Sequence, residues 1–248
     1  MRAHVTQEKP AIEAQSTAVG VPTASICNAE GGLFLRSPEG PGTDMTPPKL
    51  VVLDRDGTIN EDRIDYVRSA DEWVPIPGAL EAIARLNHAG WHVVIATNQS
   101  GLGRGLFDMA NLSAMHVKMH TLLAQVGGRI DAIFFCPHAP SESCECRKPL
   151  PGLYLEIAER YSVHANEMIT VGDSLRDLQA AVAAGCEAHL VRTGKAALVS
   201  DAEIAHWLSQ VPGSRAHVDL AAFVDFLMQR EGVNGERFGA AAGGRHAG

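Results

Sequence analysis

The sequence has no apolar run that approaches the length of a transmembrane helix, and its first residues, MRAHVTQEKPAIEAQ, lack the apolar core of a secretory signal. Aromatic residues make up only 5% of the 248 residues, and 21 Lys and Arg stand against 29 Asp and Glu, a net charge of −8. Nucleic-acid coating needs a basic face, and single-strand binding adds aromatic side chains along it. We therefore expect a cytoplasmic protein that binds neither nucleic acid nor membranes.

Cysteine is also scarce, and its odd total of five does not suit a disulfide framework. Three of the five, Cys136, Cys144 and Cys146, fall in the short segment CPHAPSESCEC together with His138. Three thiolates and one imidazole make a complete tetrahedral ligand set for zinc, with no position left open for water. We therefore predict a structural zinc site at these four residues. A redox pair and a chance cluster are the alternatives.

The chain changes character at about residue 49. Residues 1–48 are rich in Ala, Gly, Pro, Ser and Thr and show no sustained periodicity, which predicts a disordered leader. An alternative is that Met45 is the natural start. We expect residues 49–232 to form a single domain and residues 233–248 to form a flexible tail.

From residue 49 onward, apolar strand-like segments alternate with segments of helical periodicity. Repeated β–α units predict the α/β class, with a three-layer Rossmann-like arrangement of a parallel sheet and helices on both faces. No GxGxxG fingerprint is present, which argues against a dinucleotide cofactor. Strands are expected at 49–54, 91–97, 130–135, 167–172 and 187–192, and helices at 78–90, 108–126, 152–161, 174–185 and 218–230.

Acidic side chains stand at the ends of two of these strands. The first strand delivers Asp54 and Asp56, and the fourth delivers Asp173. Ligands of open α/β sheets bind outside the carboxyl ends of the strands. Asp54 and Asp173 could therefore hold one Mg²⁺, while one acid of the first pair attacks and its neighbour transfers protons. Solvated strand ends, or a helix N-cap role for Asp173 or Ser174, are the alternatives.

Two further polar segments are predicted at the same edge. TNQSG, which follows the second strand, offers a hydroxyl, amides and backbone N–H groups that can cradle a phosphate. RKP precedes the helix at 152–161 and contains Arg147 and Lys148. Lys suits a point charge on a transferring phosphoryl group, whereas Arg suits a forked contact with a second one. A polar loop and a surface basic pair are the alternatives.

DRDGT, TNQSG, RKP and GDSLRD, in this order, resemble the motifs of the haloacid dehalogenase superfamily of phosphohydrolases over residues 49–193. The resemblance implies that Asp54 is a nucleophile that forms an aspartyl-phosphate and that Asp56 acts as general acid and then as base. It also implies that Thr97 and Lys148 stabilise the phosphoryl oxygens. The implied Mg²⁺ ligands are Asp54, Asp56 through its backbone carbonyl, and Asp173.

The short spacings between the motifs leave no room for a cap domain, so a capless member is expected. DRDGTIN, TNQSG, CPH…CxCRKP and LVRTGK together are similar to the heptose bisphosphate phosphatases of that superfamily, which serve lipopolysaccharide-core precursor synthesis. The resemblance implies that the substrate is a sugar phosphate, heptose 1,7-bisphosphate, that its 7-phosphate is removed, and that Arg147 contacts the distal phosphate. Histidinol-phosphate phosphatase, and a zinc-stabilised binding module without catalysis, are the alternatives.

Two departures from that pattern affect the alignment. The segment DRIDYV, expected to form a flap over the substrate, is one residue longer than the family pattern, and Ser174 stands where some members have Lys. We expect a monomer. The implied substrate-binding residues are Asp62, Tyr66, Thr97, Asn98, Gln99, Ser100, Arg147 and Lys148.

Overall fold

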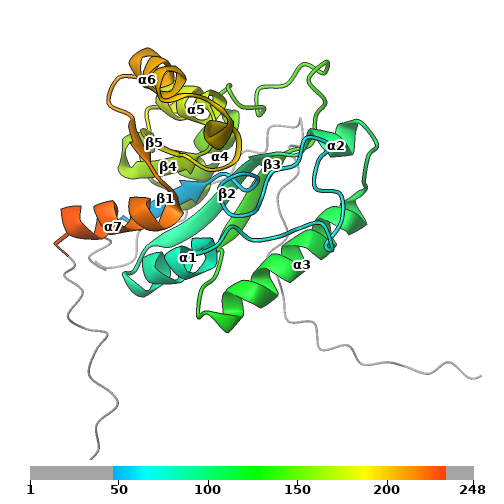
Figure 1. Cartoon of the computed structure of the whole chain (residues 1–248), viewed down its shortest axis with the longest axis horizontal. Coiled ribbons are helices and arrows are strands. Elements are labelled where there is room, and N and C mark those ends of the chain that lie inside the picture. Colours follow the sequence, from blue (N-terminus) through cyan, green and yellow to red (C-terminus); the bar gives the residue numbers. More distant parts are fainter. Residues whose placement is uncertain (1–46, 233–248) are drawn as a thin grey trace, which may run out of the picture.

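The computed structural model describes residues 47–232, which form a central sheet covered by helices on both sides (Figure 1). The predicted leader at 1–48, except for its last two residues, the predicted tail at 233–248 and the alternative start at Met45 all lie outside the described residues. Within 47–232, every helix is too short or too polar to cross a membrane.

Six strands form one parallel sheet in the order β3-β2-β1-β4-β5-β6. The five predicted strands are confirmed, with ends that differ by at most two residues. The sixth, a three-residue edge strand, was missed because so short a segment has no detectable alternation. The strands are β1 (Leu50–Leu53), β2 (His92–Asn98), β3 (Ala132–Cys136), β4 (Met168–Gly172), β5 (Glu187–Val191) and β6 (Arg215–His217).

The five predicted helices are also confirmed, whereas the short α2 and the more exposed α6 were not predicted. Helix α6 has Ile204 as its single buried residue, which leaves almost no apolar periodicity to detect. The α-helices are α1 (Ala79–His88), α2 (Ser100–Gly103), α3 (Met109–Gln125), α4 (Gly152–Tyr161), α5 (Leu175–Ala184), α6 (Asp201–Gln210) and α7 (Leu220–Arg230), with 3₁₀ turns η1 (Ala165–Glu167) and η2 (Gly194–Leu198).

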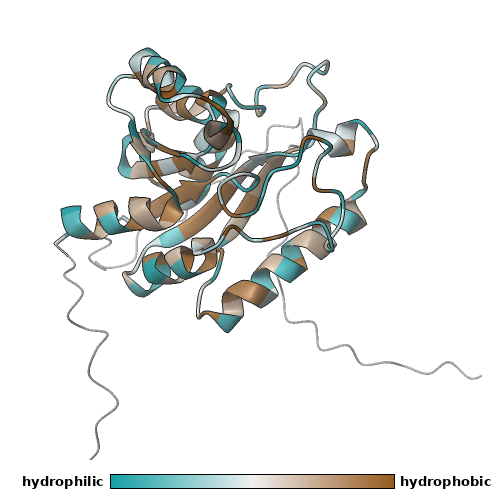
Figure 2. Cartoon of the chain, viewed as in Figure 1, coloured by the Kyte–Doolittle hydropathy of each residue, from teal (hydrophilic) through white to brown (hydrophobic). Residues whose placement is uncertain are grey.

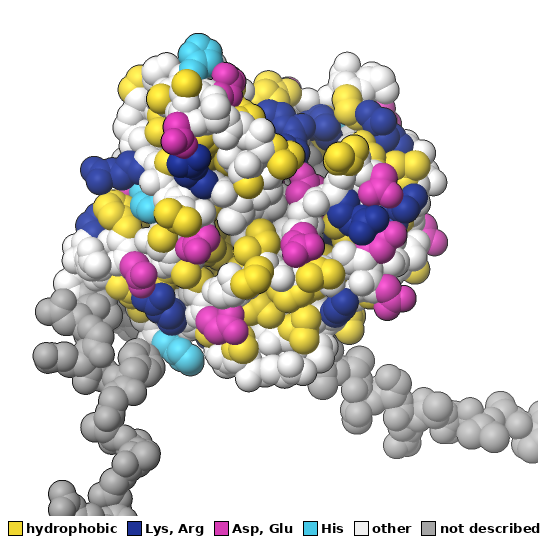
Figure 3. All heavy atoms as spheres, in the orientation of Figure 1, with side chains coloured by type: hydrophobic (Ala, Val, Ile, Leu, Met, Phe, Trp, Pro, Cys, Tyr) yellow, Lys and Arg dark blue, Asp and Glu magenta, His cyan; other side chains and the backbone are white. Residues whose placement is uncertain are grey.

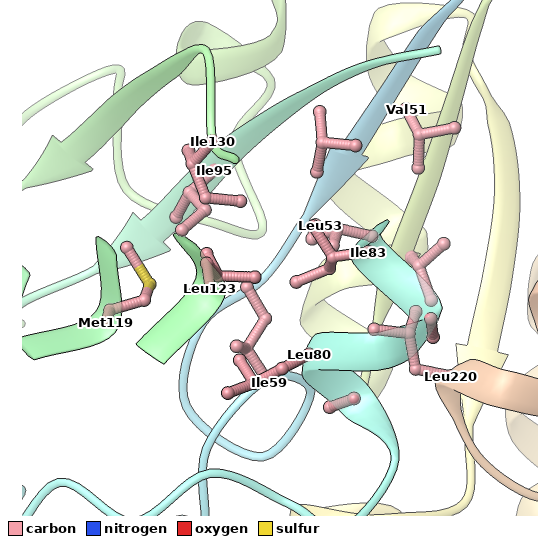
Figure 4. Close-up of a cluster of buried hydrophobic side chains, with 14 of the residues drawn as sticks. Val51, Leu53, Ile59, Leu80, Ile83, Ile95, Met119, Leu123, Ile130 and Leu220 are labelled. Carbon is pink, nitrogen blue, oxygen red and sulfur yellow. The ribbon is translucent and has the colours of Figure 1, made fainter. Parts of the chain in front are cut away.

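The side chains of β1 alternate between two hydrophobic layers. Val51 and Leu53 pack toward α1, α3 and α7 (Figure 4), and Leu50 and Val52 pack toward α4, α5 and α6. All four are fully buried, so β1 is central to both layers, and the strands form an apolar centre in Figure 2. A period of two, buried on both faces, is the pattern of a parallel strand covered by helices. The three-layer prediction is therefore confirmed.

The chain leaves β1 for β2 and β3 on one side and then crosses to β4 on the other side of β1. This reversal creates the crevice at the carboxyl ends of β1 and β4 where ligands of such sheets bind. Among the described residues, no cap domain interrupts the connections between β1 and β4, as predicted. Asp54 and Asp173 follow β1 and β4 directly, so the topology brings them together.

Candidate active site

Lys148 extends from the segment before α4 to the end of β1, where its ammonium group meets two carboxylates. Its Nζ lies 3.0 Å from Asp54 Oδ1 and 2.6 Å from Asp177 Oδ1, and it donates a hydrogen bond of 2.8 Å to the carbonyl of Ala96. Burial alone would lower the pKa of Lys148, but the charges of Asp177 and Asp54 outweigh it and raise the pKa. The ammonium group therefore stays charged beside Asp54, where it can neutralise an arriving anion.

The carboxylate of Asp56 is held by donors from three directions. The fully buried Arg55 donates from Nη2 to both oxygens at 2.9 Å, Asn60 donates at 2.9 Å, and Gln99 donates at 2.8 Å. Burial raises the pKa of Asp56, but the charge of Arg55 and the hydrogen bonds from Asn60 and Gln99 outweigh it and lower the pKa. Asp56 is therefore held ionised and in a fixed orientation.

Three carboxylates, those of Asp54, Asp173 and Asp177, have oxygens within 4.8 Å of one another. Burial, followed by the charge of Asp177, raises the pKa of Asp173 to about 8, since a further negative charge is unfavourable in this group. The Oδ1 atoms of Asp54 and Asp173 are buried and accept no hydrogen bond, although the former is ion-paired with Lys148. A buried carboxylate oxygen without a partner on Asp173, next to the carboxylate of Asp54, fits a hard divalent cation such as Mg²⁺.

Asp177 is less suited to such a cation, because both of its oxygens are already engaged. Oδ1 pairs with Lys148, and Oδ2 accepts hydrogen bonds from the backbone N–H and the hydroxyl of Ser174. Ser174, and not Asp173, is the N-cap of α5, so the carboxylate of Asp173 is not used to cap this helix. Asp54 and Asp173 lie together as expected, and their assignment as Mg²⁺ ligands, with the backbone carbonyl of Asp56, stays a prediction.

The end of β2 and the residue after it support the site mainly by positioning their neighbours. Gln99 donates from Nε2 to the Thr97 hydroxyl at 2.9 Å as well as to Asp56. The Asn98 side chain donates at 3.0 Å to the carbonyl of Lys148 and accepts at 3.1 Å from its backbone N–H. These two hydrogen bonds between Asn98 and Lys148 fix the backbone of Lys148 against β2. The Thr97 side chain is buried, at 1% exposure.

A cavity of about 430 Å³ opens above these groups, and every predicted catalytic and substrate-binding residue lines it. Five of the 21 Lys and Arg residues line the cavity together with four Asp residues, so the lining is close to neutral although the whole chain is acidic. On the face shown in Figure 3, by comparison, Lys and Arg side chains stand among Asp and Glu side chains. The predicted lining residues are Asp54, Asp56, Asp62, Tyr66, Thr97, Asn98, Gln99, Ser100, Arg147 and Lys148.

Three cavity cations, Arg63, Arg176 and Lys195, were not assigned a role from the sequence. Arg63 forms an ion pair with Asp65 within the flap. Lys195, in η2, forms an ion pair with Asp62 of the flap, and Arg176, in the first turn of α5, lines the cavity with an exposed side chain. Within residues 47–232, Arg176 has no hydrogen-bond or ion-pair partner. The signal for Lys195 was its position three residues after the expected end of the fifth strand, at the edge shared by all parallel strands.

The four predicted zinc ligands converge after β3. Cys136 Sγ lies 3.5 Å from His138 Nδ1 and 3.8 Å from Cys144 Sγ, and Cys146 Sγ lies 3.3 Å from His138 Nδ1. Around a tetrahedral zinc with Zn–S bonds of about 2.3 Å, neighbouring sulfurs lie about 3.8 Å apart. The donor set and its spacing therefore fit zinc. The loop ends on Arg147, which donates to the His138 carbonyl at 3.4 Å.

A family model described as haloacid dehalogenase-like hydrolase matches residues 50–185. The D-glycero-beta-D-manno-heptose-1,7-bisphosphate 7-phosphatase of Bordetella bronchiseptica is 55% identical over 184 residues, which cover 73% of this chain and 98% of that protein. The protein of the same name from Pseudomonas aeruginosa is 52% identical over 146 residues, which cover 59% and 82%.

Two solved structures are similar as well. The crystal structure of D,D-heptose 1,7-bisphosphate phosphatase from B. bronchiseptica, complexed with magnesium and phosphate, matches with a TM-score of 0.68, covering 73% of this chain and 99% of that chain at 55% identity. The enzyme of the same name from Burkholderia thailandensis matches with a TM-score of 0.55 at 53% identity, covering 72% and 98%.

Proposed function

Because this chain belongs to the haloacid dehalogenase-like hydrolase family, we propose that it is a Mg²⁺-dependent phosphatase that removes the 7-phosphate of D-glycero-beta-D-manno-heptose 1,7-bisphosphate. The observation that carries the reaction type is the buried contact between Asp54 and Lys148 at the floor of the cavity, beside the fixed carboxylate of Asp56. The two similar relatives described above have the same name, D-glycero-beta-D-manno-heptose-1,7-bisphosphate 7-phosphatase, and this supports the proposed substrate. Its product would enter the synthesis of lipopolysaccharide-core precursors.

In the first step, a carboxylate oxygen of Asp54 attacks the phosphorus of the 7-phosphate. A bond forms between that oxygen and phosphorus, the bond from phosphorus to the sugar oxygen breaks, and the sugar oxygen takes a proton from Asp56. An arriving phosphate is an anion and raises the pKa of a neighbouring carboxyl, which favours the protonated form of Asp56 that this step needs. Lys148 and the Thr97 hydroxyl contact the phosphoryl oxygens as their charge is redistributed.

In the second step, a water molecule attacks the phosphorus of the aspartyl-phosphate. Its proton passes to Asp56, the bond between Asp54 and phosphorus breaks, and inorganic phosphate leaves. Arg55 and Gln99 hold the Asp56 carboxylate in the orientation that receives this proton. Both steps therefore use one carboxyl group in its two protonation states.

Asp54, Asp173 and the backbone carbonyl of Asp56 would hold Mg²⁺, which when bound offsets the negative charges of the phosphate and the nucleophile. The unsatisfied oxygen of Asp173, next to the carboxylate of Asp54, supports this assignment. Cys136, His138, Cys144 and Cys146 would hold a structural zinc that stiffens the loop leading to Arg147.

A substrate with two phosphates explains the additional cations at the cavity. Lys148 faces Asp54, whereas Arg147 and Arg176 line the cavity without a carboxylate partner among residues 47–232. Guanidinium groups form forked contacts with phosphates, so these two arginines suit the phosphate that is retained. Histidinol phosphate would instead bring a cationic amine to this end of the cavity.

We also propose that residues 49–232 form the whole phosphatase domain and that it acts as a monomer in the cytoplasm. A single sheet with two hydrophobic layers supports a single domain. The four cysteines of the described residues are free thiols, as a zinc site requires. Light scattering of the purified chain tests the monomer, and a dimer would contradict it.

A kinetic panel tests the substrate. Turnover of the beta and alpha anomers of heptose 1,7-bisphosphate and of histidinol phosphate should be measured with Mg²⁺ and with a chelator. We expect kcat/KM to be highest for the beta anomer and activity to require Mg²⁺. A clear preference for histidinol phosphate would contradict the substrate, and the absence of any phosphatase activity would favour a binding module.

A further inference from the structure

Lys195 contacts two parts of the candidate active site through two different donors. Its backbone N–H donates a hydrogen bond of 2.6 Å to Asp173 Oδ2, and its side-chain ammonium group forms an ion pair with Asp62 Oδ2. Asp62 belongs to the flap, residues 61–72, whereas Asp173 follows β4. One residue after β5 thus joins the carboxylate suited to Mg²⁺ to the segment over the cavity.

The two residues before Lys195 are fitted against the turn that follows Asp54. The Thr193 hydroxyl donates a hydrogen bond of 2.5 Å to the carbonyl of Gly57. A Cβ placed on Gly194 would lie 2.2 Å from Asp173 Oδ2 and 2.5 Å from Gly57 Cα. Only glycine allows so close an approach, and its φ of +49° also favours glycine. The segment therefore has little freedom to move away from Asp173.

These contacts engage one oxygen of Asp173 and leave the other available. Oδ2 accepts the Lys195 N–H, and the backbone carbonyl of Asp173 accepts from Ala196 N–H at 3.0 Å, whereas Oδ1 accepts no hydrogen bond. Partners of this kind orient a metal-binding carboxylate so that its free oxygen faces the metal.

The flap is fixed at its base by Lys118, and its first residues are held by Lys195. At the base, Lys118 Nζ donates to the carbonyls of Ala70 and Trp73 at 2.7 and 2.8 Å. In the first residues of the flap, among the described residues, the Asp62–Lys195 pair is the single hydrogen bond or ion pair from the side chains of residues 61–66 to a segment outside the flap. Ile64, which lines the cavity, is fully exposed. Tyr66 packs against the hydrophobic core and its ring lies 5.9 Å from the guanidinium of Arg104, so Lys195 supplies the ion pair that holds Asp62 in addition to these contacts.

We propose that Lys195 is a positioning residue for the phosphatase reaction: its backbone N–H orients Asp173 toward Mg²⁺, and its ammonium group holds the flap over the cavity through Asp62. The proposal rests on the proposed function for its substrate, but its two contacts can be tested without any substrate. The ammonium group also lies 3.8 Å from Asp173 Oδ2, but the hydrogen bond to that oxygen comes from the backbone N–H, so a side-chain substitution removes the charge and leaves the hydrogen bond.

Lys195→Met removes the ammonium group and keeps the backbone N–H. We expect hydrogen exchange of residues 61–66 to increase about fivefold, as for the loss of a partly exposed ion pair, while calorimetric Mg²⁺ affinity is not weakened. KM for the bisphosphate should rise about fivefold with little change in kcat. Lys195→Arg should restore both values. Lys49→Met, which breaks the exposed ion pair with Glu231 far from the cavity, is the control and should change neither.

Gly194→Ala displaces the segment from Asp173. We expect calorimetric Mg²⁺ affinity to fall about tenfold or more, as when the supporting partner of a metal ligand is lost. Gly213→Ala is the matched control, since Gly213 also has positive φ, of +91°, but has nothing within 4 Å of a built Cβ. If Gly194→Ala does not fold, Thr193→Val should weaken Mg²⁺ binding and Thr193→Ser should restore it.

Unchanged flap exchange in Lys195→Met, or Mg²⁺ affinity in the folded Gly194→Ala or Thr193→Val variant equal to that of the Gly213→Ala control, would overturn the proposal. Neither measurement uses the bisphosphate. Failure of the wild-type protein to hydrolyse that substrate would contradict the proposed function and would leave these two tests of Lys195 valid.

Discussion

The ammonium group of Lys148 lies 2.6 Å from Asp177 Oδ1, and both side chains are buried, at 2% and 4% exposure. The pair positions the same ammonium group that reaches Asp54 on its other side. Asp177 thus acts on the nucleophile through Lys148. Its carboxylate is also one of the three, with those of Asp54 and Asp173, that lie close enough together to hold a metal ion.

Asp177→Asn tests this relationship. We expect kcat to fall about a hundredfold because Lys148 is no longer fixed, and we expect unfolding to become easier by about 3 kcal/mol because a buried charge loses a partner. Calorimetric Mg²⁺ affinity should fall less than in Asp173→Asn. Asp201→Asn, at an exposed pair with Arg192, is the control and should be near neutral. Equal losses of Mg²⁺ affinity in the first two variants would make Asp177 a ligand.

Asp54→Asn tests the nucleophile. An amide cannot form the aspartyl-phosphate, so turnover should fall by at least about a thousandfold while the circular dichroism spectrum is unchanged. The measurement is hydrolysis of the bisphosphate and of an aryl phosphate under the same conditions. Retained activity on both would remove Asp54 from this role.

Cys144→Ser tests the zinc site. We expect zinc content, measured by elemental analysis, to fall well below one per chain, and the melting temperature to fall because a loop that depends on metal binding is released. Cys186→Ser is the matched control: Cys186 is buried but lies outside the ligand cluster, so zinc content should be unchanged. Wild-type protein without zinc would contradict the assignment.

Arg147→Ala and Arg176→Ala test the contact with the retained phosphate. Each should raise KM for the bisphosphate about tenfold or more, since a charge-assisted contact to that phosphate is lost. Hydrolysis of an aryl phosphate, which has no second phosphate, should change less than threefold. Equal effects on the two substrates would show that these arginines do not distinguish them. Arg160→Ala, on α4 away from the cavity lining, is the control.

His217 makes stability depend on pH at a site far from the cavity. Burial, followed by the charges of His189 and Arg215, lowers the pKa of His217 to about 4 from 6.5. The pKa of His217 is lower in the folded than in the unfolded protein. Its contribution to the free energy of unfolding is therefore full above about pH 6.5 and is lost as the pH falls toward 4. Between pH 7.5 and 5.0 the free energy of unfolding of the wild type should fall by about 1 to 2 kcal/mol more than that of His217→Gln. This value is reduced because His217 is partly exposed.

Urea denaturation at the two pH values measures this difference. His206→Gln, at an exposed histidine of α6, is the control. If the difference between wild type and His217→Gln is the same at both pH values, the pKa shift of His217 is not linked to folding.

Local sequence was sufficient for most of the strands and helices and for much of the site. The alternation in Leu50 to Leu53 fixes which side chains face each hydrophobic layer, because successive residues of a strand point to opposite faces. The acids that follow β1 and β4 were recognisable because strand ends are where such sheets bind ligands. The zinc ligands were recognisable because three cysteines and a histidine in one short loop have few other uses.

The tertiary structure decided which of these groups act together. Asp62 and Lys195 are separated by 133 residues, and Lys148 meets Asp177 only because β4 lies next to β1. Side-chain periodicity is a local property that a sequence displays directly. Contacts between distant segments depend on strand order and on the exact approach of backbones, such as Gly194 against Asp173, and no local pattern encodes them.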